Sequence, residues 1–215
     1  MTSISFRDID PRDRYKLLCG VVIPRPIALV TTCNEDGRVN AAPFSFFNVF
    51  SEDPPLIVLG LQHRSDSSPK DTTRNIHRSG EFVIHMVDEQ IAASMNDCAI
   101  DFPSGDSEVD AVGLATLPSI DVAVPRLAAA PFALECRQHV VLAFGAGREL
   151  LVGNVLRLHA RDGLIDEAKM HVDLDVYRPI GRLFSDLYAT QRDRFALARE
   201  SHAQWLARNQ CKENQ

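Results

Sequence analysis

A short polar stretch at residues 69–76, PKDTTRNI, has the composition of an anion-binding helix start. The first backbone N–H groups of a helix lack partners inside the helix and carry a partial positive charge, which favours a bound anion. The ammonium of Lys70 and the hydroxyls of Thr72 and Thr73 would strengthen such a site, and they suit a phosphate. An ordinary helix start capped by Asp71, with Lys70 in solvent, explains the same residues and stays open as the alternative.

A second stretch, Asn40 to Phe50 (NAAPFSFFNVF), suits a flat apolar ligand. Its alanines let the backbone approach a ligand closely, its phenylalanines offer stacking surface, and Ser45 and Asn48 add polar contacts. Thr31 and Thr32 contribute two hydroxyls from the neighbouring strand of a predicted hairpin. The alternative is that the phenylalanines only fill a barrel core. Taken together, an anion site and a planar apolar site describe the two ends of flavin mononucleotide (FMN).

The sequence contains none of the familiar catalytic signatures. There is no G-x-S-x-G, H-E-x-x-H or Walker loop, and no G-x-G-x-x-G that follows a strand and opens a helix. The seven histidines show no ligand pairing, and the five cysteines include no C-x-x-C. We therefore predict no catalytic side chain and no metal site, and we expect a bound cofactor to supply any chemistry.

Runs rich in β-branched residues predict six strands with few helices between them. Residues 26–32 are expected to form a hairpin with the run after the Asn34–Gly37 turn, and further strands are expected at residues 56–62, 81–87, 132–144 and 149–163. The last two are expected to form a second hairpin, joined through the turn GAGR (145–148). This pattern favours an antiparallel barrel over a doubly wound sheet.

Three helices are expected beside these strands. One is capped by Ser68 or Asp71 and stopped by Gly80, and a second runs from Asp88 to about Asp97. The third, near residues 195–206, has a narrow apolar face that would dock on the barrel or on a second subunit.

Composition limits the classes of function. A chain of 215 residues that is 45% hydrophobic and 24% charged suits one globular core, and the net charge of −6 argues against binding to nucleic acid. The charged N-terminus does not resemble a signal peptide, and no apolar run is long enough to span a membrane. We expect a cytoplasmic protein with no membrane partner.

Five fragments, in this order and at similar spacings, resemble the flavin reductase-like, FMN-binding split-barrel family. They are RPIALVTT (25–32), DGRVNAAPFSFFN (36–48), DPP (53–55), KDTTRNI (70–76) and GEFVIHMV (80–87). Weaker matches follow at residues 151–165 and 177–188. The resemblance implies a six-stranded antiparallel split β-barrel of Greek-key type over residues 1–190, with short flanking helices and a C-terminal helical extension over residues 191–215. It also implies a homodimer that binds flavin near the subunit interface.

The resemblance also assigns the cofactor site. Its residues are Thr31, Thr32, Ala42, Pro43, Phe44, Ser45, Phe46, Phe47, Asn48, Lys70, Asp71, Thr72, Arg182 and Tyr188. The chain departs from the family where Phe184 and Ser185 replace two glycines, so that access of nicotinamide to the flavin is in question. His85 is a second departure, since many relatives carry asparagine there; a hydrogen-bonded strand histidine is the expected role.

The resemblance implies an NAD(P)H-dependent flavin reductase. NADH or NADPH would reduce bound FMN, with FAD as the other flavin considered, and electrons would pass to free flavin, to another small acceptor or to a partner monooxygenase. The alternative is a flavoprotein electron carrier that a protein partner reduces, without pyridine-nucleotide turnover. A flavin-binding protein with no turnover is a third reading.

Overall fold

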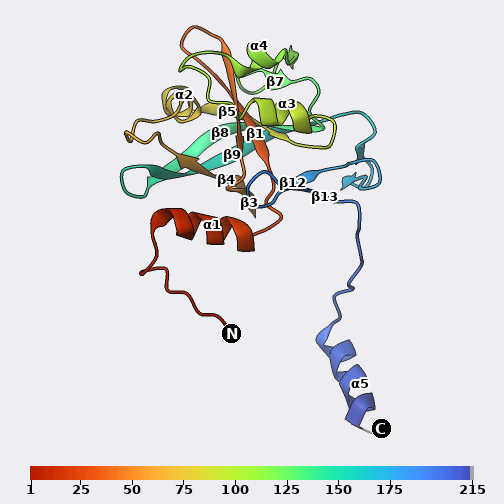
Figure 1. Cartoon of the computed structure of the whole chain (residues 1–215). Coiled ribbons are helices and arrows are strands. Elements are labelled where there is room, and N and C mark those ends of the chain that lie inside the picture. The colour runs from red at the N-terminus through yellow and green to blue at the C-terminus, as the bar shows by residue number, and fades with distance from the viewer. Residues whose placement is uncertain (214–215) are drawn as a thin grey trace.

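The computed structural model describes residues 1–213, and its centre is one seven-stranded antiparallel sheet. The sheet order is β2-β1-β5-β8-β9-β4-β3. Its strands are β1 (Ala28–Cys33), β2 (Val39–Phe44), β3 (Phe47–Glu52), β4 (Pro55–Gln62), β5 (Glu81–Met86), β8 (Phe132–Ala143) and β9 (Arg148–Ala160). Figure 1 shows how these strands coil around one another into a barrel.

The two edge strands of this sheet, β2 and β3, follow one another in the chain. The chain turns at Ser45 and Phe46, and the Gly60 N–H donates to the Phe46 carbonyl at 2.7 Å. This corner brings the sheet edges together at one point and leaves them apart elsewhere, which is a split barrel. The predicted fold class is confirmed. Only the strand count differs, because the stretch Asn40–Phe50 contains two strands rather than one.

Both predicted hairpins are present. β1 and β2 are joined by a turn in which the Asn34 N–H donates to the Arg38 carbonyl at 2.8 Å, and Gly37 adopts the positive φ of 84° that glycine tolerates best. β8 and β9 form the longest ladder of the sheet and meet at the turn around Gly145.

The predicted helices are present with shifted boundaries. α2 (Asp71–Ser79) ends at Gly80 as expected, and α3 (Ala92–Asp97) begins later than expected because the Asp88 carboxylate first accepts two backbone N–H groups in a turn. α1 (Pro11–Val21) and α4 (Glu108–Val112) were not predicted. Asp10 caps α1 and Pro11 opens it, a signal that the sequence does contain.

Three two-stranded ribbons complete the body. They are β6 (Thr116–Leu117) with β7 (Arg126–Leu127), β10 (Ile165–Asp166) with β11 (His171–Val172), and β12 (Ile180–Arg182) with β13 (Tyr188–Thr190).

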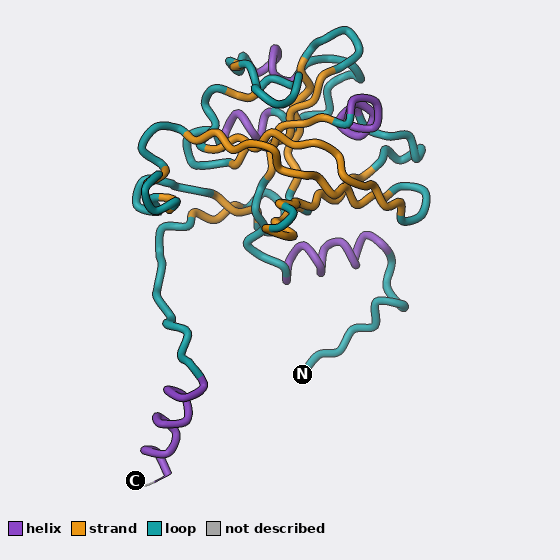
Figure 2. The backbone as a smooth tube through the Cα atoms, turned by 180° about the vertical axis from the view of Figure 1, so that it is seen from behind, coloured by secondary structure: helices purple, strands orange, loops and turns teal. Residues whose placement is uncertain are grey.

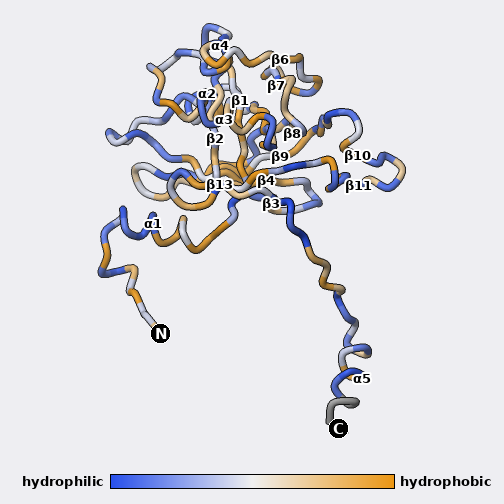
Figure 3. The backbone as a smooth tube through the Cα atoms, turned by 45° about the vertical axis from the view of Figure 1, so that its right-hand side comes forward, coloured by the Kyte–Doolittle hydropathy of each residue, from blue (hydrophilic) through white to orange (hydrophobic). Residues whose placement is uncertain are grey.

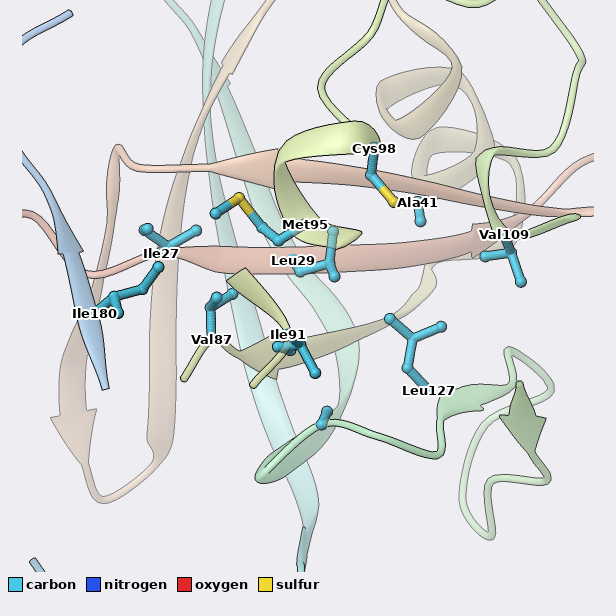
Figure 4. Packing of buried hydrophobic residues seen from close by; sticks show 11 residues of the cluster. Ile27, Leu29, Ala41, Val87, Ile91, Met95, Cys98, Val109, Leu127 and Ile180 are labelled. Atoms are coloured by element: carbon cyan, nitrogen blue, oxygen red, sulfur yellow. The ribbon is translucent and has the colours of Figure 1, made fainter. Parts of the chain in front are cut away.

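Two groups of buried side chains hold the barrel together. Inside the barrel, Phe82 and the aliphatic residues of β1, β4 and β9 pack with Ile76, so that α2 closes one end. Gly153 makes room there, because a Cβ at this position would lie 2.6 Å from the Phe82 ring. The second group lies on the other face of β1 and β2, where Met95 of α3 and Val109 of α4 cover Leu29 and Ala41 (Figure 4).

Both chain ends leave the barrel. α1 lies on the opposite side from α3 and α4, and after β13 the chain runs outward to α5 (His202–Glu213), as Figures 1 and 2 show. The connecting segment contains the apolar residues Phe195 and Leu197, which are 87% and 85% exposed. Figure 3 shows hydrophobic stretches in this segment between the barrel and α5. A helix is present near the expected position, but it covers His202–Glu213, so Phe195 lies outside it and the expected apolar face forms only in part. This helix does not dock on its own barrel. No helix within residues 1–213 has the length and apolar character to cross a membrane.

Candidate functional site

The β2–β3 corner forms one wall of a cavity of about 270 Å³, called the corner cavity below. Its lining residues are Leu18, Val22, Pro24, Arg25, Pro26, Ser45, Phe46, Phe47 and Asn48. The sequence predicted Ser45 to Asn48 as ligand contacts, and the structure brings these four residues together here. The first two lining residues come from α1 and its end, which the sequence analysis missed.

The phenylalanines of residues 40–50 divide between two roles, packing in the barrel core and facing a ligand cavity. Phe44 and Phe47 pack against the barrel core, as the alternative reading required. Phe46 remains 47% exposed in the corner cavity, with its ring centroid 6.3 Å from that of Tyr15 on α1. In one unbroken strand Phe44 and Phe47 would face opposite sides of the sheet, and the break at Ser45 and Phe46 lets both pack against the same core.

Arg25 is the most buried polar group of the corner cavity, with 6% of its surface exposed. Its guanidinium donates to the Ser45 hydroxyl at 3.3 Å and to three carbonyls, those of Cys19 at 2.5 Å, Val22 at 3.2 Å and Leu183 at 2.8 Å. One side chain therefore ties α1 and the turn after β12 to the β2–β3 corner. The sequence hinted at this only through an arginine between two prolines.

Arg182 and Tyr188 lie beside this cavity on β12 and β13. Arg25 and Arg182 exchange two backbone hydrogen bonds of 2.9 Å each. The Arg182 guanidinium donates to the Tyr188 hydroxyl and lies 4.5 Å from its ring centroid, and that hydroxyl donates to Asn96. Tyr188 lines a second cavity of about 390 Å³ between α3 and β12–β13, whereas Arg182 lines neither cavity.

The turn between β12 and β13 holds the two residues that replace the family's glycines. Ser185 has a φ of 54°, in the left-handed region that favours glycine, so the glycine-like backbone shape is kept. Phe184 is 41% exposed. Neither side chain lines the corner cavity or the second cavity.

The start of α2 differs in detail from the prediction. Lys70 occupies the N-cap position and its side chain makes no cap, and neither Ser68 nor Asp71 caps the helix. Asp71 instead accepts hydrogen bonds from Arg64 at 3.1 Å, from Arg74 and from Ser104 at 2.8 Å. Within the described chain, the N–H groups of the first three α2 residues have no acceptor. The expected cap is thus wrong, and the helix start is left free to bind an anion.

Charge around this helix start is mainly positive. Arg64, Lys70 and Arg74 face two carboxylates, those of Asp66 and Asp71. Lys70 is exposed. A phosphate bound here would meet a partial positive charge, free N–H groups and a mobile ammonium.

The predicted threonines are buried and already hydrogen-bonded. Thr72 accepts from Asn40 at 3.0 Å, Thr32 accepts from Asn75 at 3.0 Å, and Thr31 donates to the Pro125 carbonyl at 2.9 Å. Their hydroxyls anchor α2 and the loop before β7 to β1 and β2. Neither Thr31 nor Thr32 lines the corner cavity, so their place in the cofactor site stays a prediction.

Strand β2 connects the two candidate ends of the site. Asn40 contacts α2, and β2 ends four residues later at Phe44, directly before Ser45 of the corner cavity. Four residues of a strand span about 13 Å. Ala42 and Pro43 lie between them and are partly exposed. A ligand that joined both ends would lie along this strand.

His85 is a structural histidine, as predicted. It is fully buried, donates from Nδ1 to the Leu29 carbonyl at 2.9 Å and accepts the Leu127 N–H at Nε2 at 2.8 Å. Burial lowers the pKa of His85 to about 4, because the loss of hydration outweighs the hydrogen bond to Leu29, and Arg126 lowers it further. Residues 1–213 contain no cluster of three or more side chains suited to a metal ion.

Comparison with known proteins places this fold in a family. The family model described as Flavin reductase like domain matches residues 21–181. The chain therefore belongs to the flavin reductase-like family, as its sequence motifs indicated, and this membership supports an oxidoreductase that uses flavin.

Similar proteins cover nearly the whole chain. An uncharacterized protein of Halalkalibacterium halodurans is 40% identical over 198 residues, which are 90% of this chain and 94% of that protein. The uncharacterized protein YwrF of Bacillus subtilis is 39% identical over 198 residues, 90% of this chain and 96% of that protein.

Two solved structures are similar in both sequence and fold. Pseudomonas fluorescens 2-nitrobenzoate 2-nitroreductase is 40% identical, with a TM-score of 0.87 over 94% of this chain and 98% of that chain. Nitrilotriacetate monooxygenase component B from Bacillus cereus is 34% identical, with a TM-score of 0.88 over 92% of this chain and 98% of that chain.

Proposed function

We propose that this protein is an FMN-dependent oxidoreductase in which NADH or NADPH reduces the bound flavin and an acceptor then reoxidises it. One observation carries the proposal: β2 joins an uncapped, positively charged helix start to a cavity with an exposed phenylalanine and a buried arginine. Membership of the flavin reductase-like family supports it.

The residues present fit FMN. At the helix start, three free N–H groups and Lys70 suit one terminal phosphate. At the other end, Ala42 to Asn48 suit a planar ring, because small residues allow close approach and Phe46 offers an exposed aromatic face. One phosphate site of this kind favours FMN over FAD. We propose Lys70, Asp71 and Thr72 at the phosphate end and residues 42–48, with Thr31, Thr32, Arg182 and Tyr188 around them, as the cofactor site.

When bound, the flavin supplies hydride and electron transfer; the chain supplies binding, orientation and exclusion of water. Phe46, Leu18 and Val22 present apolar surface that would keep water from the ring, and Arg25 fixes the three elements around it. No side chain has to donate or remove a proton for hydride to pass between stacked rings. This fits the lack of a catalytic dyad in the sequence.

Electron carriage without pyridine nucleotide is the second candidate function. An electron carrier of this kind would need side chains that block nicotinamide from reaching the flavin. The sequence offered Phe184 and Ser185 for that role. Since neither lines either cavity, the geometry supports the reductase.

We further propose a homodimer in the cytoplasm. Large apolar side chains are exposed on β3, on β8 and the turn after it, and on β9: Val49, Phe50, Val140, Leu142, Phe144, Leu156 and Leu158. Exposed apolar side chains in such number favour a protein interface. A partner monooxygenase is a candidate acceptor, because a relative of 34% identity is component B of such a system.

Anaerobic mixing of the flavin-loaded protein with NADH and, separately, with NADPH tests the reductase. We expect the yellow absorbance of FMN to disappear within seconds with at least one coenzyme. Dithionite serves as the control that the bound flavin is reducible. Full bleaching by dithionite with none by either coenzyme would reject the reductase in favour of the carrier.

A further inference from the structure

The Arg25 guanidinium is buried without a negatively charged partner. It is 6% exposed, and no ion pair within residues 1–213 includes it. Its four hydrogen bonds go to a hydroxyl and three carbonyls, which are neutral. These bonds use four of its five N–H groups and leave its charge uncompensated. Removing a charge from water is costly unless an opposite charge lies nearby, so this burial calls for a counter-ion.

The surroundings do not supply one. The cavity that Arg25 lines is otherwise built from prolines, aliphatic and aromatic side chains, Ser45 and Asn48, none of which is acidic. The neighbouring Arg182 adds a second positive charge, and its guanidinium contacts Tyr188 rather than a carboxylate. Both arginines act on Tyr15 at the rim of the cavity: burial raises the pKa of Tyr15, and the two charges oppose that rise.

The shape and lining of the corner cavity limit the kind of ligand that fits. Phe46 presents an exposed ring to the corner cavity, and the prolines on either side of Arg25 present flat apolar faces. Such walls favour a planar ring over a flexible chain. A guanidinium beside them suits a planar anion, which it attracts through its charge and can contact through its one remaining N–H group.

We propose that the corner cavity binds a planar ring that carries negative charge and that Arg25 is its counter-ion. This inference rests on the proposed function: the reduced flavin has that chemistry, and so would a small acceptor with a carboxylate on an aromatic ring. Arg25 would hold either one against Phe46 and stabilise its charge.

Benzoate and its neutral analogue benzamide are the probes. Calorimetric titration of the flavin-free full chain is expected to show benzoate binding at least about tenfold more tightly than benzamide. Arg25→Gln should abolish that preference while benzamide binding is unchanged. Leu18→Trp should weaken both probes by filling the cavity from α1, where residue 18 is 48% exposed and tolerates a larger side chain. This second variant keeps the test decisive if Arg25→Gln fails to fold.

Repeating the titration on FMN-loaded protein shows whether the corner cavity holds the flavin ring or a separate acceptor. If FMN excludes benzoate, the ring that Arg25 serves is the flavin, and Arg25→Gln should then lower the midpoint potential of the bound flavin. If benzoate still binds, the cavity serves a separate acceptor. Equal affinity for benzoate and benzamide, or no binding of either to the flavin-free chain, would overturn the proposal. Benzoate binding to flavin-free protein requires no reductase activity. The titration therefore tests the corner cavity even if the protein proves not to be a reductase.

Discussion

At the scale of single residues, Lys70 tests where the phosphate binds. Its ammonium is exposed beside three free N–H groups. A charge-assisted contact to phosphate is worth about 1.5–3 kcal/mol, so Lys70→Ala should weaken FMN binding about tenfold to a hundredfold. Riboflavin lacks the phosphate and should bind the variant and the wild type equally. Arg78→Ala, at the far end of α2, is a matched control and should leave both ligands unaffected.

Two outcomes of these titrations would contradict the assignment. Equal losses for FMN and riboflavin would mean that the substitution disturbs the fold or the ring site. An unchanged affinity for FMN would place the phosphate elsewhere, because an exposed lysine without a partner contributes little.

His85 makes a different prediction, about acid stability. The pKa of its imidazole is about 4 in the folded protein and 6.5 when unfolded, so the neutral form stabilises the fold fully above pH 6.5 and progressively less as the pH falls toward 4. This group alone should remove about 2 kcal/mol from the free energy of unfolding between pH 7 and pH 5. Urea unfolding at the two pH values measures that loss.

His85→Asn supplies the comparison. It cannot titrate, so its stability should fall less steeply between pH 7 and pH 5 than that of the wild type. At pH 7 it should be less stable by about 1–3 kcal/mol, because the Leu127 N–H loses its acceptor. Parallel losses in the two proteins would show that His85 is not the group responsible.

At the scale of elements, the segment before β7 depends on one buried carboxylate. Glu135 on β8 is fully buried and accepts the N–H groups of Ile120 at 2.8 Å, Asp121 at 2.5 Å and Val122 at 3.2 Å, as well as His159 at 2.5 Å. This segment also bears the Pro125 carbonyl that accepts from Thr31. A sheet residue therefore holds an irregular stretch in place.

Glu135→Gln should release that stretch without unfolding the barrel. The amide replaces one acceptor with a donor that faces other donors, at a cost of about 1–3 kcal/mol. Hydrogen exchange should accelerate in residues 119–125 while β4 and β9 stay protected. Glu81→Gln is the control, since Glu81 holds only the Ala123 N–H of this segment, at 2.9 Å, and a smaller effect is expected. Uniform acceleration across all strands would refute local release.

At the scale of the whole molecule, the chain after β13 is the part least tied to the barrel. It contacts the body through exposed ion pairs, Arg192 with Glu89 and Arg194 with Asp175. Its apolar side chains Phe195, Leu197, Trp205 and Leu206 are exposed. Phe195 and Leu197 lie in the connecting segment and Trp205 and Leu206 in α5, and apolar side chains that their own barrel does not cover suit contact with a second copy of the chain.

Removal of residues 191–215 tests both the domain boundary and the dimer. The truncated chain should keep its barrel, because exposed ion pairs contribute at most about 1 kcal/mol each, so the hydrogen-exchange protection of its barrel strands should match that of the full chain. Light scattering at micromolar concentration should give a dimer for the full chain and a larger monomer fraction for the truncated one. A full-length monomer with FMN bound would contradict the proposed homodimer.

The sequence by itself determined the fold class, both hairpins and the helix that Gly80 ends, because strand propensity, turn residues and helix stops act within a few residues. It also predicted Ser45 to Asn48 as ligand contacts, because their composition fits poorly with an ordinary strand, and in the structure these four residues line the corner cavity. It did not give the helix cap, where propensity favoured Ser68 or Asp71. Arg64 and Arg74, brought together by folding, engage Asp71 instead.

Only the tertiary structure decided which phenylalanines are core and which face the cavity, because that depends on a corner at Ser45 and Phe46 that the closing of the barrel creates. Arg25 likewise has no local signal. Its partners lie on α1, at the β2–β3 corner and at Leu183, 158 residues along the chain. A buried charge without a counter-ion becomes visible only when every neighbour is in place, since burial is a property of the whole fold and charge a property of the residue.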